Sequence, residues 1–434
     1  MTKIINGDSI KELKKFPDNY FHSVVTDPPY GLSFMGKKWD CDVPSVELWQ
    51  EVLRVLKEGG YLLSFAGTRT QHRMAVNIED AGFEIRDMIA WVYGSGFPKS
   101  HNIGKAIDKL QGNEREDLEP YGRYKNSFKD HKGKFVNTRD ADGTKRINVN
   151  LTKGNSEWEG WGTALKPALE PITMARKPFK GTVANNVLTN GVGGINIDGC
   201  RVGVDRNNER EYDKEIYSGK KGRVVKGKTS FLSGEIKTKR NDEWLNKGRF
   251  PANFIHDGSD EVKDLFPETK SGGGDKCKEG RQSTNYGIYG KHIPNETKTY
   301  TVDSGNASRF FYCAKASKQD RNEGLEETQE LSHRPSGVAY NNQSGVHSEK
   351  KKGNHHPTVK PTDLMRYLVR LVTPKNGIVL DCFMGSGSTG KACALEGFNF
   401  VGIDLDKDYC EIAKARIDKA LEDKKQDEAQ QELF

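Results

Sequence analysis

The sequence Asp27-Pro28-Pro29-Tyr30 joins a carboxylate, two rigid residues and an aromatic ring. It follows the short apolar run 22–26 (HSVVT), which is typical of a buried β-strand. Because proline fixes its own backbone angle, the two prolines make a stiff turn at the end of that strand. There a carboxylate and a free backbone carbonyl can accept the two N–H groups of a planar amine, while the tyrosine ring stacks on the ring bearing it. The motif predicts a site for an aromatic amino group, with a purely structural proline turn as the alternative.

A second motif lies near the C-terminus, where the apolar strand predicted at 378–382 runs into the glycine-rich turn 383–390 (FMGSGSTG). Glycines let a backbone approach a ligand closely, and the N-terminus of the following helix attracts an anionic group. Nineteen residues separate Gly385 from Asp404, the usual interval to a carboxylate that binds ribose hydroxyls. A nicotinamide dinucleotide would suit this pattern. The presence of two glycines instead of three, and of Asp381 before the turn, favours a nucleoside that carries an amino acid.

The two motifs together resemble those of the DNA amino-methyltransferases, which use S-adenosylmethionine to methylate exocyclic nitrogens of bases. The tetrapeptide precedes the glycine loop here, which is the circularly permuted order of the β class of that family. Roughly half of the chain takes part in the resemblance, with further matching segments at 7–8, 91–102, 161–178, 309–321 and 356–361. Cys382 departs from the proline that the family usually has before its phenylalanine.

The resemblance implies a role for each motif residue. Asp27 and Pro28 accept hydrogen bonds from the target amino group, Pro29 stiffens the motif, and Tyr30 stacks on the base. The residues implied for S-adenosyl-L-methionine are Asp8, Thr358, Lys360, Asp381, Phe383, Gly385, Ser386, Gly387, Thr389 and Asp404.

Within the cofactor set the implied contacts differ. Asp404 takes the ribose hydroxyls, Asp381 lies near the ammonium group, Asp8 lies on the adenine side, and Thr358 and Lys360 cover the methionine end. A structural alternative stays open for three of them, namely a turn cap for Asp8, a surface charge for Lys360 and a helix cap for Asp404. No metal ion is expected.

Apolar periodicity predicts alternating strands and helices at both ends of the chain, which is the mark of an α/β fold with a parallel sheet. The resemblance narrows this to a Rossmann-like methyltransferase sheet with a permuted motif order and an inserted target-recognition region. The strands are predicted at 22–26, 61–65, 83–92, 378–382 and 400–403, and the helices at 46–56, 70–81, 361–373, 389–396 and 407–421.

Composition and charge divide the chain of 434 residues. The predicted parts are an N-terminal catalytic half at 1–100, a basic insert at 101–330, a flexible loop at 331–355, a C-terminal catalytic half at 356–422 and a polar tail at 423–434. The insert holds 41 basic and 34 acidic residues, so it carries the whole net charge of +7. A lobe with all of this excess fits a polyanion-binding surface.

These observations predict a site-specific enzyme that methylates the N6 amino group of adenine in double-stranded DNA, since an aspartate at the first motif position favours adenine by resemblance. The alternatives are an N4-cytosine DNA methyltransferase, an RNA adenine methyltransferase and a catalytically silent DNA-binding homologue. Methylation of cytosine C5 is discounted because it requires a thiolate, and the nearest cysteine to Asp27 is Cys41. The seven scattered cysteines and the lack of a long apolar run predict a soluble cytoplasmic protein with no membrane partner.

The chain ends in Gln430-Gln431-Glu432-Leu433-Phe434, which places two large apolar side chains after a polar stretch. The spacing of Gln430, Leu433 and Phe434 resembles peptides that dock bacterial DNA enzymes on the replication sliding clamp. The alternative is a tail that frays or folds back onto the enzyme. A monomer or a homodimer is expected.

Overall fold

The computed structural model describes residues 1–32, 41–96, 100–117, 152–203, 248–270, 304–314, 319–325, 354, 356 and 358–431, with two short strands, β6 (Phe128–Lys129) and β7 (Phe135–Val136). The chain divides into two compact units. One comprises Met1–Gly94 and Leu169–Phe434, and the other comprises Ser95–Ala168.

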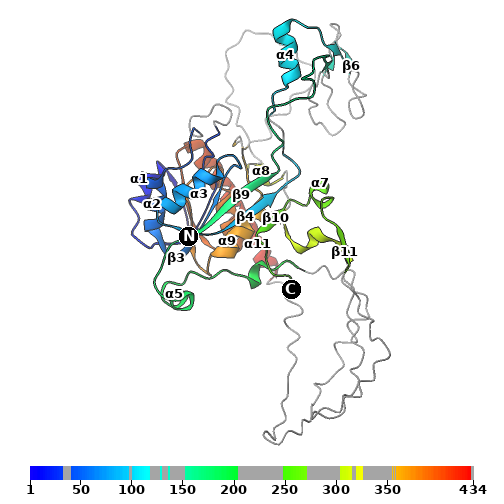
Figure 1. The fold of residues 1–434 in the computed structure, drawn as a ribbon. Coiled ribbons are helices and arrows are strands. Elements are labelled where there is room, and N and C mark those ends of the chain that lie inside the picture. Colours follow the sequence, from blue (N-terminus) through cyan, green and yellow to red (C-terminus); the bar gives the residue numbers. More distant parts are fainter. Residues whose placement is uncertain are drawn as a thin grey trace, which may run out of the picture. The chain divides into compact units, whose positions relative to one another are not determined.

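The larger unit is built on a sheet of nine described strands (Figure 1). Their order across the sheet is β1-β15-β14-β2-β3-β9-β4-β10-β13. Strand β9 is antiparallel to both of its neighbours, and every other described pairing in this sheet is parallel. The strands are β1 (Thr2–Asn6), β2 (Phe21–Thr26), β3 (Leu56–Phe65), β4 (Glu84–Val92), β9 (Leu169–Arg176), β10 (Phe254–His256), β13 (Tyr312–Cys313), β14 (Ile378–Asp381) and β15 (Asn399–Asp404).

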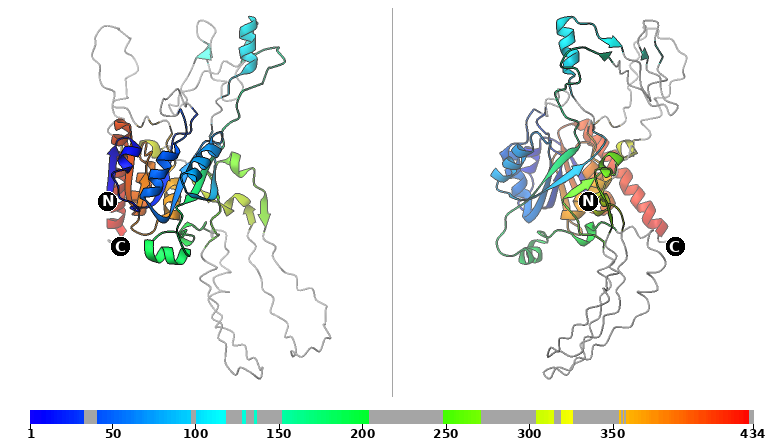
Figure 2. Two further views of the ribbon diagram at one scale, coloured as in Figure 1. Left: turned by 60° about the vertical axis from the view of Figure 1, so that its left-hand side comes forward. Right: turned by 45° about the vertical axis from the view of Figure 1, so that its right-hand side comes forward.

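Helices cover both faces of this sheet. Successive residues of a strand point to opposite faces, so each face has its own buried cluster. Val24 and Leu62 belong to one buried cluster, and their chain neighbours Val25 and Leu63 belong to the other. The first cluster is closed by α1 (Ser9–Leu13), α2 (Val46–Val55) and α3 (Gln71–Asp80). The second is closed by α9 (Thr362–Val372), α10 (Ser388–Glu396) and α11 (Lys407–Gln431), which are coloured orange to red in Figure 2.

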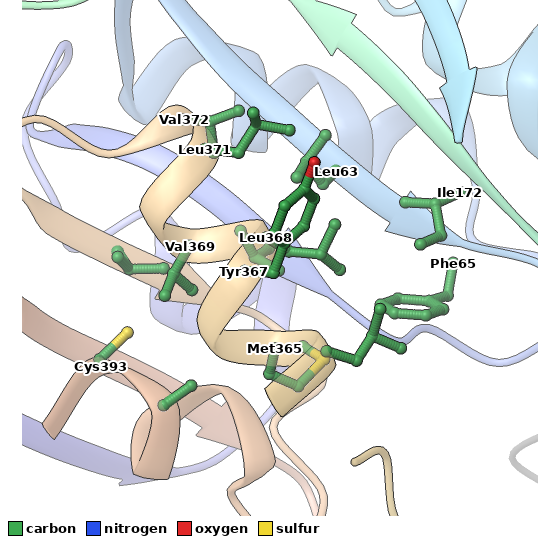
Figure 3. Packing of buried hydrophobic residues seen from close by; sticks show 14 of the residues in the cluster. Leu63, Phe65, Ile172, Met365, Tyr367, Leu368, Val369, Leu371, Val372 and Cys393 are labelled. Carbon is green, nitrogen blue, oxygen red and sulfur yellow. The ribbon is translucent and has the colours of Figure 1, made fainter. Parts of the chain in front are cut away.

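Helix α9 is the apolar centre of the second face. Its side chains Met365 and Leu368 are almost fully buried, and they point toward Phe65 and Ile172 of the sheet (Figure 3). Burying side chains of this size stabilises the fold by roughly 1.5–3 kcal/mol each. The packing fixes the start of α9, and therefore also fixes the residues that precede it.

Smaller elements surround the sheet. They are α5 (Val183–Asn190), the short helices η4 (Asp198–Cys200), α7 (Asp260–Lys263), η7 (Ala307–Phe310) and α8 (Gln319–Asn322), and the antiparallel pair of β11 (Glu268–Lys270) with β12 (Ser304–Asn306). No helix in the described part of the chain is long and apolar enough to cross a membrane.

The unit Ser95–Ala168 contains α4 (Ile103–Gln111) and the strand pair β5 (Glu116–Asp117) and β8 (Thr152–Lys153). Its centre is ionic, because the Arg115 guanidinium bonds to Asp108 and, at 2.8 Å, to Glu159. Trp158 and Trp161 make an edge-to-face pair on its exposed surface, with ring centroids 5.2 Å apart.

The predicted α/β fold is confirmed, and the ends of the predicted elements agree to within one residue, except that β3 begins five residues earlier and α11 ends ten residues later than predicted. The insert predicted at 101–330 is not a single body, because β9, β10 and β13 from within it join the main sheet. Their apolar residues find neighbours there; Ile172 and Ile255 are fully buried.

Two further predicted boundaries fall near the C-terminus. The flexible loop predicted at 331–355 lies outside the described residues, apart from Asn354. The polar tail predicted from 423 is helical as far as Gln431, because its glutamates, lysines and glutamines favour helix and Lys419 pairs with Asp423 at 2.8 Å.

Candidate active site

The two sequence motifs meet where the strand order reverses. Strands β2 and β14 are neighbours, and from them the chain moves outward in opposite directions, to β3 from β2 and to β15 from β14. Open α/β sheets bind their ligands at the carboxyl ends of the strands at such a point. Asp27 directly follows β2, Asp381 ends β14, and Asp404 ends β15, so all three acids lie at one edge of the sheet.

The tetrapeptide folds back on itself at this edge. The Tyr30 hydroxyl donates a hydrogen bond to Asp27 Oδ1 at 2.8 Å. Thr70, just before α3, donates to the Tyr30 carbonyl at 2.7 Å. The motif is therefore held from both sides, and its carboxylate and ring keep a fixed relation, as the sequence predicts.

Lys360 lies in contact with the same carboxylate. Its Nζ is 2.8 Å from Asp27 Oδ2, 2.9 Å from Glu170 Oε2 and 3.1 Å from the Tyr30 hydroxyl. Only 7% of the Lys360 side chain is exposed, so the alternative of a surface charge is wrong. Packing of α9 brings Lys360 here, since the lysine stands two residues before that helix. Its implied contact with the methionine end of a cofactor stays a prediction.

Glu170 completes the group, which we call the acid–lysine cluster: Asp27, Tyr30, Tyr93, Glu170 and Lys360. The Tyr30 hydroxyl lies 3.1 Å from Glu170 Oε2, and the Tyr93 hydroxyl donates to Glu170 Oε1 at 3.2 Å. Because β9 is antiparallel, its first residues rather than its last lie at the active edge, where Glu170 stands opposite Trp91 of β4. The sequence prediction missed Glu170; the available signal was an acid before a proline at the start of an apolar run (LEPITM).

Burial and charge shift the acid–base properties of the cluster. Burial alone would lower the pKa of Lys360, but the Asp27 and Glu170 carboxylates together raise it well above its usual value. Burial raises the pKa of the Tyr30 hydroxyl, and the two carboxylates add to this effect. The pKa of Tyr93 is raised by burial and then by Glu170. The lysine therefore stays charged, and both tyrosines stay neutral, through the neutral pH range.

The glycine loop after β14 takes conformations that favour glycine. Gly385 and Gly387 have φ values of +53° and +80°. A side chain at Gly385 would come within 2.8 Å of the His356 ring, and one at Gly387 would come within 2.7 Å of Ala413 on α11. The loop is fixed further by Arg416, a fully buried residue whose Nη1 lies 3.1 Å from Ser386 Oγ. These contacts leave little freedom for the backbone of the loop.

Asp404 and His356 border this loop. The Gly385 N–H donates to Asp404 Oδ2 at 2.7 Å, and the Asp406 N–H donates to Asp404 Oδ1 at 2.9 Å. Burial lowers the pKa of His356 to about 4, so its ring is neutral. The ring Nδ1 donates to the carbonyl of Thr358, whose own side chain is exposed.

Asp381 lies in the core behind the loop. One oxygen accepts from Thr26 Oγ1 at 2.7 Å and from the Phe383 N–H at 3.2 Å, and the other accepts from Thr389 Oγ1 at 2.6 Å. Burial raises the pKa of Asp381 to about 7, although these hydrogen bonds oppose the shift. Cys382, which follows it, is also buried.

Asp8 has a local role at the same edge. It caps α1 by accepting from the Lys11 N–H at 3.0 Å, as the turn-cap alternative expects. The preceding residue, Gly7, donates to the Asp404 carbonyl at 2.9 Å, so β1 ends beside β15. The contacts proposed for the cofactor-binding residues stay predictions.

Comparison with known proteins gives a family match over most of the chain. The N6_N4_Mtase family, described as DNA methylase, matches residues 21–415. The type II methyltransferase M.HindIII of Haemophilus influenzae is 26% identical over 237 residues, which are 44% of this chain and 64% of that protein. M2.LlaDCHI of Lactococcus lactis subsp. cremoris is 43% identical over 72 residues, which are 17% of this chain and 26% of that protein. The chain thus matches less than two thirds of the length of either relative.

Among solved structures, the M1.HpyAVI–SAM complex is 15% identical with a TM-score of 0.36, and the match covers 96% of this chain and all of that one. PvuII DNA methyltransferase, described as cytosine-N4-specific, is 12% identical with a TM-score of 0.40, covering 96% of this chain and 87% of the other. The family match spans the tetrapeptide, the glycine loop and Asp404. The chain therefore belongs to the N6/N4 family of DNA methylases.

Proposed function

We propose that this protein is a site-specific DNA methyltransferase that moves a methyl group from S-adenosyl-L-methionine to the N6 amino group of adenine. One observation carries the proposal: the Asp27 carboxylate and the Tyr30 ring lie at the end of β2, beside the glycine loop that ends the neighbouring strand β14. One strand end thus offers groups for an aromatic amine, and the next offers groups for a nucleoside.

The residues after β14 and β15 suit such a cofactor chemically. Each oxygen of Asp404 accepts a backbone N–H, and a carboxylate oxygen has room for a second donor, so a ribose diol can bind there. Gly385 and Gly387 hold the loop in left-handed conformations that favour glycine, which fixes the turn to which we assign the methionine part. We assign Asp404 to the ribose, and Phe383, Gly385, Ser386 and Gly387 to the methionine part.

When bound, S-adenosylmethionine supplies a methyl group that is already activated by its sulfonium charge. The work of this chain is then to position the amino nitrogen. Asp27 and the Pro28 carbonyl accept the two N–H groups of the base, which favours a nucleophilic nitrogen and stabilises the positive charge that develops there. The base must leave the duplex first, at a cost of a few kcal/mol that stacking on Tyr30 partly offsets.

The identity of the base and the wider partners are part of this proposal. Aspartate at the first position of the motif favours adenine, and N4-cytosine methylation is the competing outcome. Double-stranded DNA is the proposed substrate, and the cytoplasm is the proposed location. We also propose docking on a replication sliding clamp through Gln430, Leu433 and Phe434; Gln430 lies in the last turn of α11, and the other two residues lie outside the described part of the chain.

The test is incubation of the purified protein with S-adenosylmethionine and unmethylated genomic DNA, followed by digestion to nucleosides and mass spectrometry. We expect N6-methyladenine from the parent protein and none from Asp27→Ala. N4-methylcytosine instead would move the proposal to the other branch of the family. Absence of both products would support a silent DNA-binding homologue, and incubation with RNA tests the remaining alternative.

A further inference from the structure

Glu170 contacts three members of the acid–lysine cluster, although it lies outside both sequence motifs. It is the second residue of β9, whose first residues lie at the edge of the sheet that holds Asp27. Only 18% of its side chain is exposed. Both of its oxygens are engaged, Oε1 by Tyr93 and Oε2 by Lys360 and Tyr30. A glutamate that served only to pair strands would not need to reach three side chains of the site.

The ammonium group of Lys360 connects Glu170 to Asp27. An ammonium has three protons, and Lys360 has three acceptors at 2.8–3.1 Å, namely Asp27, Glu170 and the Tyr30 hydroxyl. If Glu170 lost its charge, the lysine would lose one of its two anionic partners. Its ammonium would then be free to shift toward Asp27, the carboxylate that must receive the target amino group.

The net charge of the acid–lysine cluster also indicates a role for Glu170. Lys360 alone would neutralise Asp27, so an Asp27–Lys360 pair would offer no net charge to a nitrogen that becomes positive. With Glu170 added, the described cluster has two carboxylates and one ammonium, and it carries a net charge of −1. Such a site, partly screened from water, stabilises positive charge developing on a base more strongly than a neutral one.

We infer that Glu170 is a positioning residue of the methyl transfer, which holds Lys360 and Tyr30 so that Asp27 can receive the target amino group, and which keeps the cluster negative. This inference rests on the proposed function and assigns it a residue outside both sequence motifs. Glu170 acts through Lys360 and Tyr30, and no contact of its own with the base is required.

Two substitutions test the charge of Glu170 and its reach in turn, and the inference requires both. Glu170→Gln keeps the length of the side chain and removes the charge, while Glu170→Asp keeps the charge and shortens the chain. Glu84→Gln is the matched control, because Glu84 pairs with Arg176 at 2.6 Å on the same two strands, at the opposite end of their pairing. The control removes one carboxylate of an ion pair from β4 and β9 without touching the acid–lysine cluster.

The measurements are the single-turnover rate of methyl transfer to duplex DNA and the dissociation constants for cofactor and DNA. For Glu170→Gln and Glu170→Asp we expect the rate to fall about 10- to 150-fold, as for the loss of one hydrogen bond to a charged group, with both constants within threefold of the parent. Glu84→Gln should keep the parent rate. This split between rate and binding is not expected from a general loss of structure.

Several results would overturn the inference. An unchanged rate in Glu170→Gln would show that Glu170 is dispensable, and equal losses of rate and binding, or a loss shared by Glu84→Gln, would indicate a structural role. A parent protein that binds cofactor and DNA but transfers no methyl group would overturn the proposed function as well. An active parent with an active Glu170→Gln would overturn this inference alone.

Discussion

Asp381→Asn should make the protein more stable at alkaline pH and should change the way its stability depends on pH. The carboxylate of Asp381 is 2% exposed, and burial raises its pKa from 3.8 to about 7. Between these two values the folded protein keeps the proton, whereas the unfolded chain releases it. Stability is therefore lost as the pH rises from about 4 to 7, and the loss stays constant above pH 7.

The size of the effect follows from this difference in pKa. At 1.36 kcal/mol for each pH unit, ionising Asp381 costs the folded state about 4 kcal/mol above pH 7, of which about 3 kcal/mol accrues between pH 5 and pH 7. Asparagine has nearly the same shape and is not ionised. It can donate to Thr389 Oγ1, which lies 2.6 Å from the carboxylate, and Thr389 can in turn donate to the Val25 carbonyl at 3.5 Å.

Urea unfolding followed by fluorescence of the buried residues Trp49 and Trp91 measures the free energy of unfolding. We expect the difference between Asp381→Asn and the parent to grow by about 3 kcal/mol from pH 5 to pH 8. Asp8→Asn is the control, because Asp8 is exposed and asparagine caps a helix equally well. A difference that is the same at both pH values would refute the argument that a buried, proton-holding carboxylate lies behind the glycine loop.

Three other outcomes are expected. Asp27→Ala should abolish methyl transfer and leave the calorimetric affinity for S-adenosylmethionine within several-fold of the parent, because we assign Asp27 to the target base and not to the cofactor. A folded variant that binds no cofactor would contradict this assignment. Asp404→Ala should weaken cofactor binding about 10- to 150-fold through loss of charge-assisted bonds, and an unchanged dissociation constant would place the ribose elsewhere. Deleting Leu433 and Phe434 should keep methylation of short duplexes and remove association with the sliding clamp in a pull-down, whereas loss of activity would mean that the tail packs on the enzyme.

The sequence predicts the strands at the centre of the sheet well, because those strands are short apolar runs between clear helix signals. Val379 and Leu380, for example, form an apolar run between the turn at Pro374–Gly377 and the glycine loop. Strand β1 and the antiparallel strand β9 were not predicted. Thr2–Asn6 is partly exposed and mixed in character, and Leu169–Arg176 stands within a segment whose composition resembles a loop.

The residues of the candidate site also differ in how well the sequence predicts their positions. Asp27, Tyr30 and Asp404 can be placed at strand ends from the sequence, because each belongs to a motif at the end of a recognisable strand. The contacts of Lys360 with Asp27 and Tyr30, and the presence of Glu170 in the site, are not predictable from the motifs. Their positions depend on the packing of α9 and on the direction of β9, and neither of these long-range features leaves a local pattern in the sequence.

The antiparallel direction of β9 also affects how this chain can vary. Val92, the last residue of β4, pairs directly with Leu169, the first residue of β9, so the chain leaves and re-enters the sheet at two adjacent points. The segment between these two residues is therefore a long insertion, and the pairing of β4 with β9 holds its two ends together. The entropic cost of closing a longer loop grows only slowly, by about 0.6 kcal/mol for each doubling of its length. Such an insertion can therefore be lengthened, shortened or replaced at little cost in stability. The sheet and four of the five residues of the acid–lysine cluster would remain, and the chain would be free to diverge beyond Tyr93, the one cluster residue that lies within this segment.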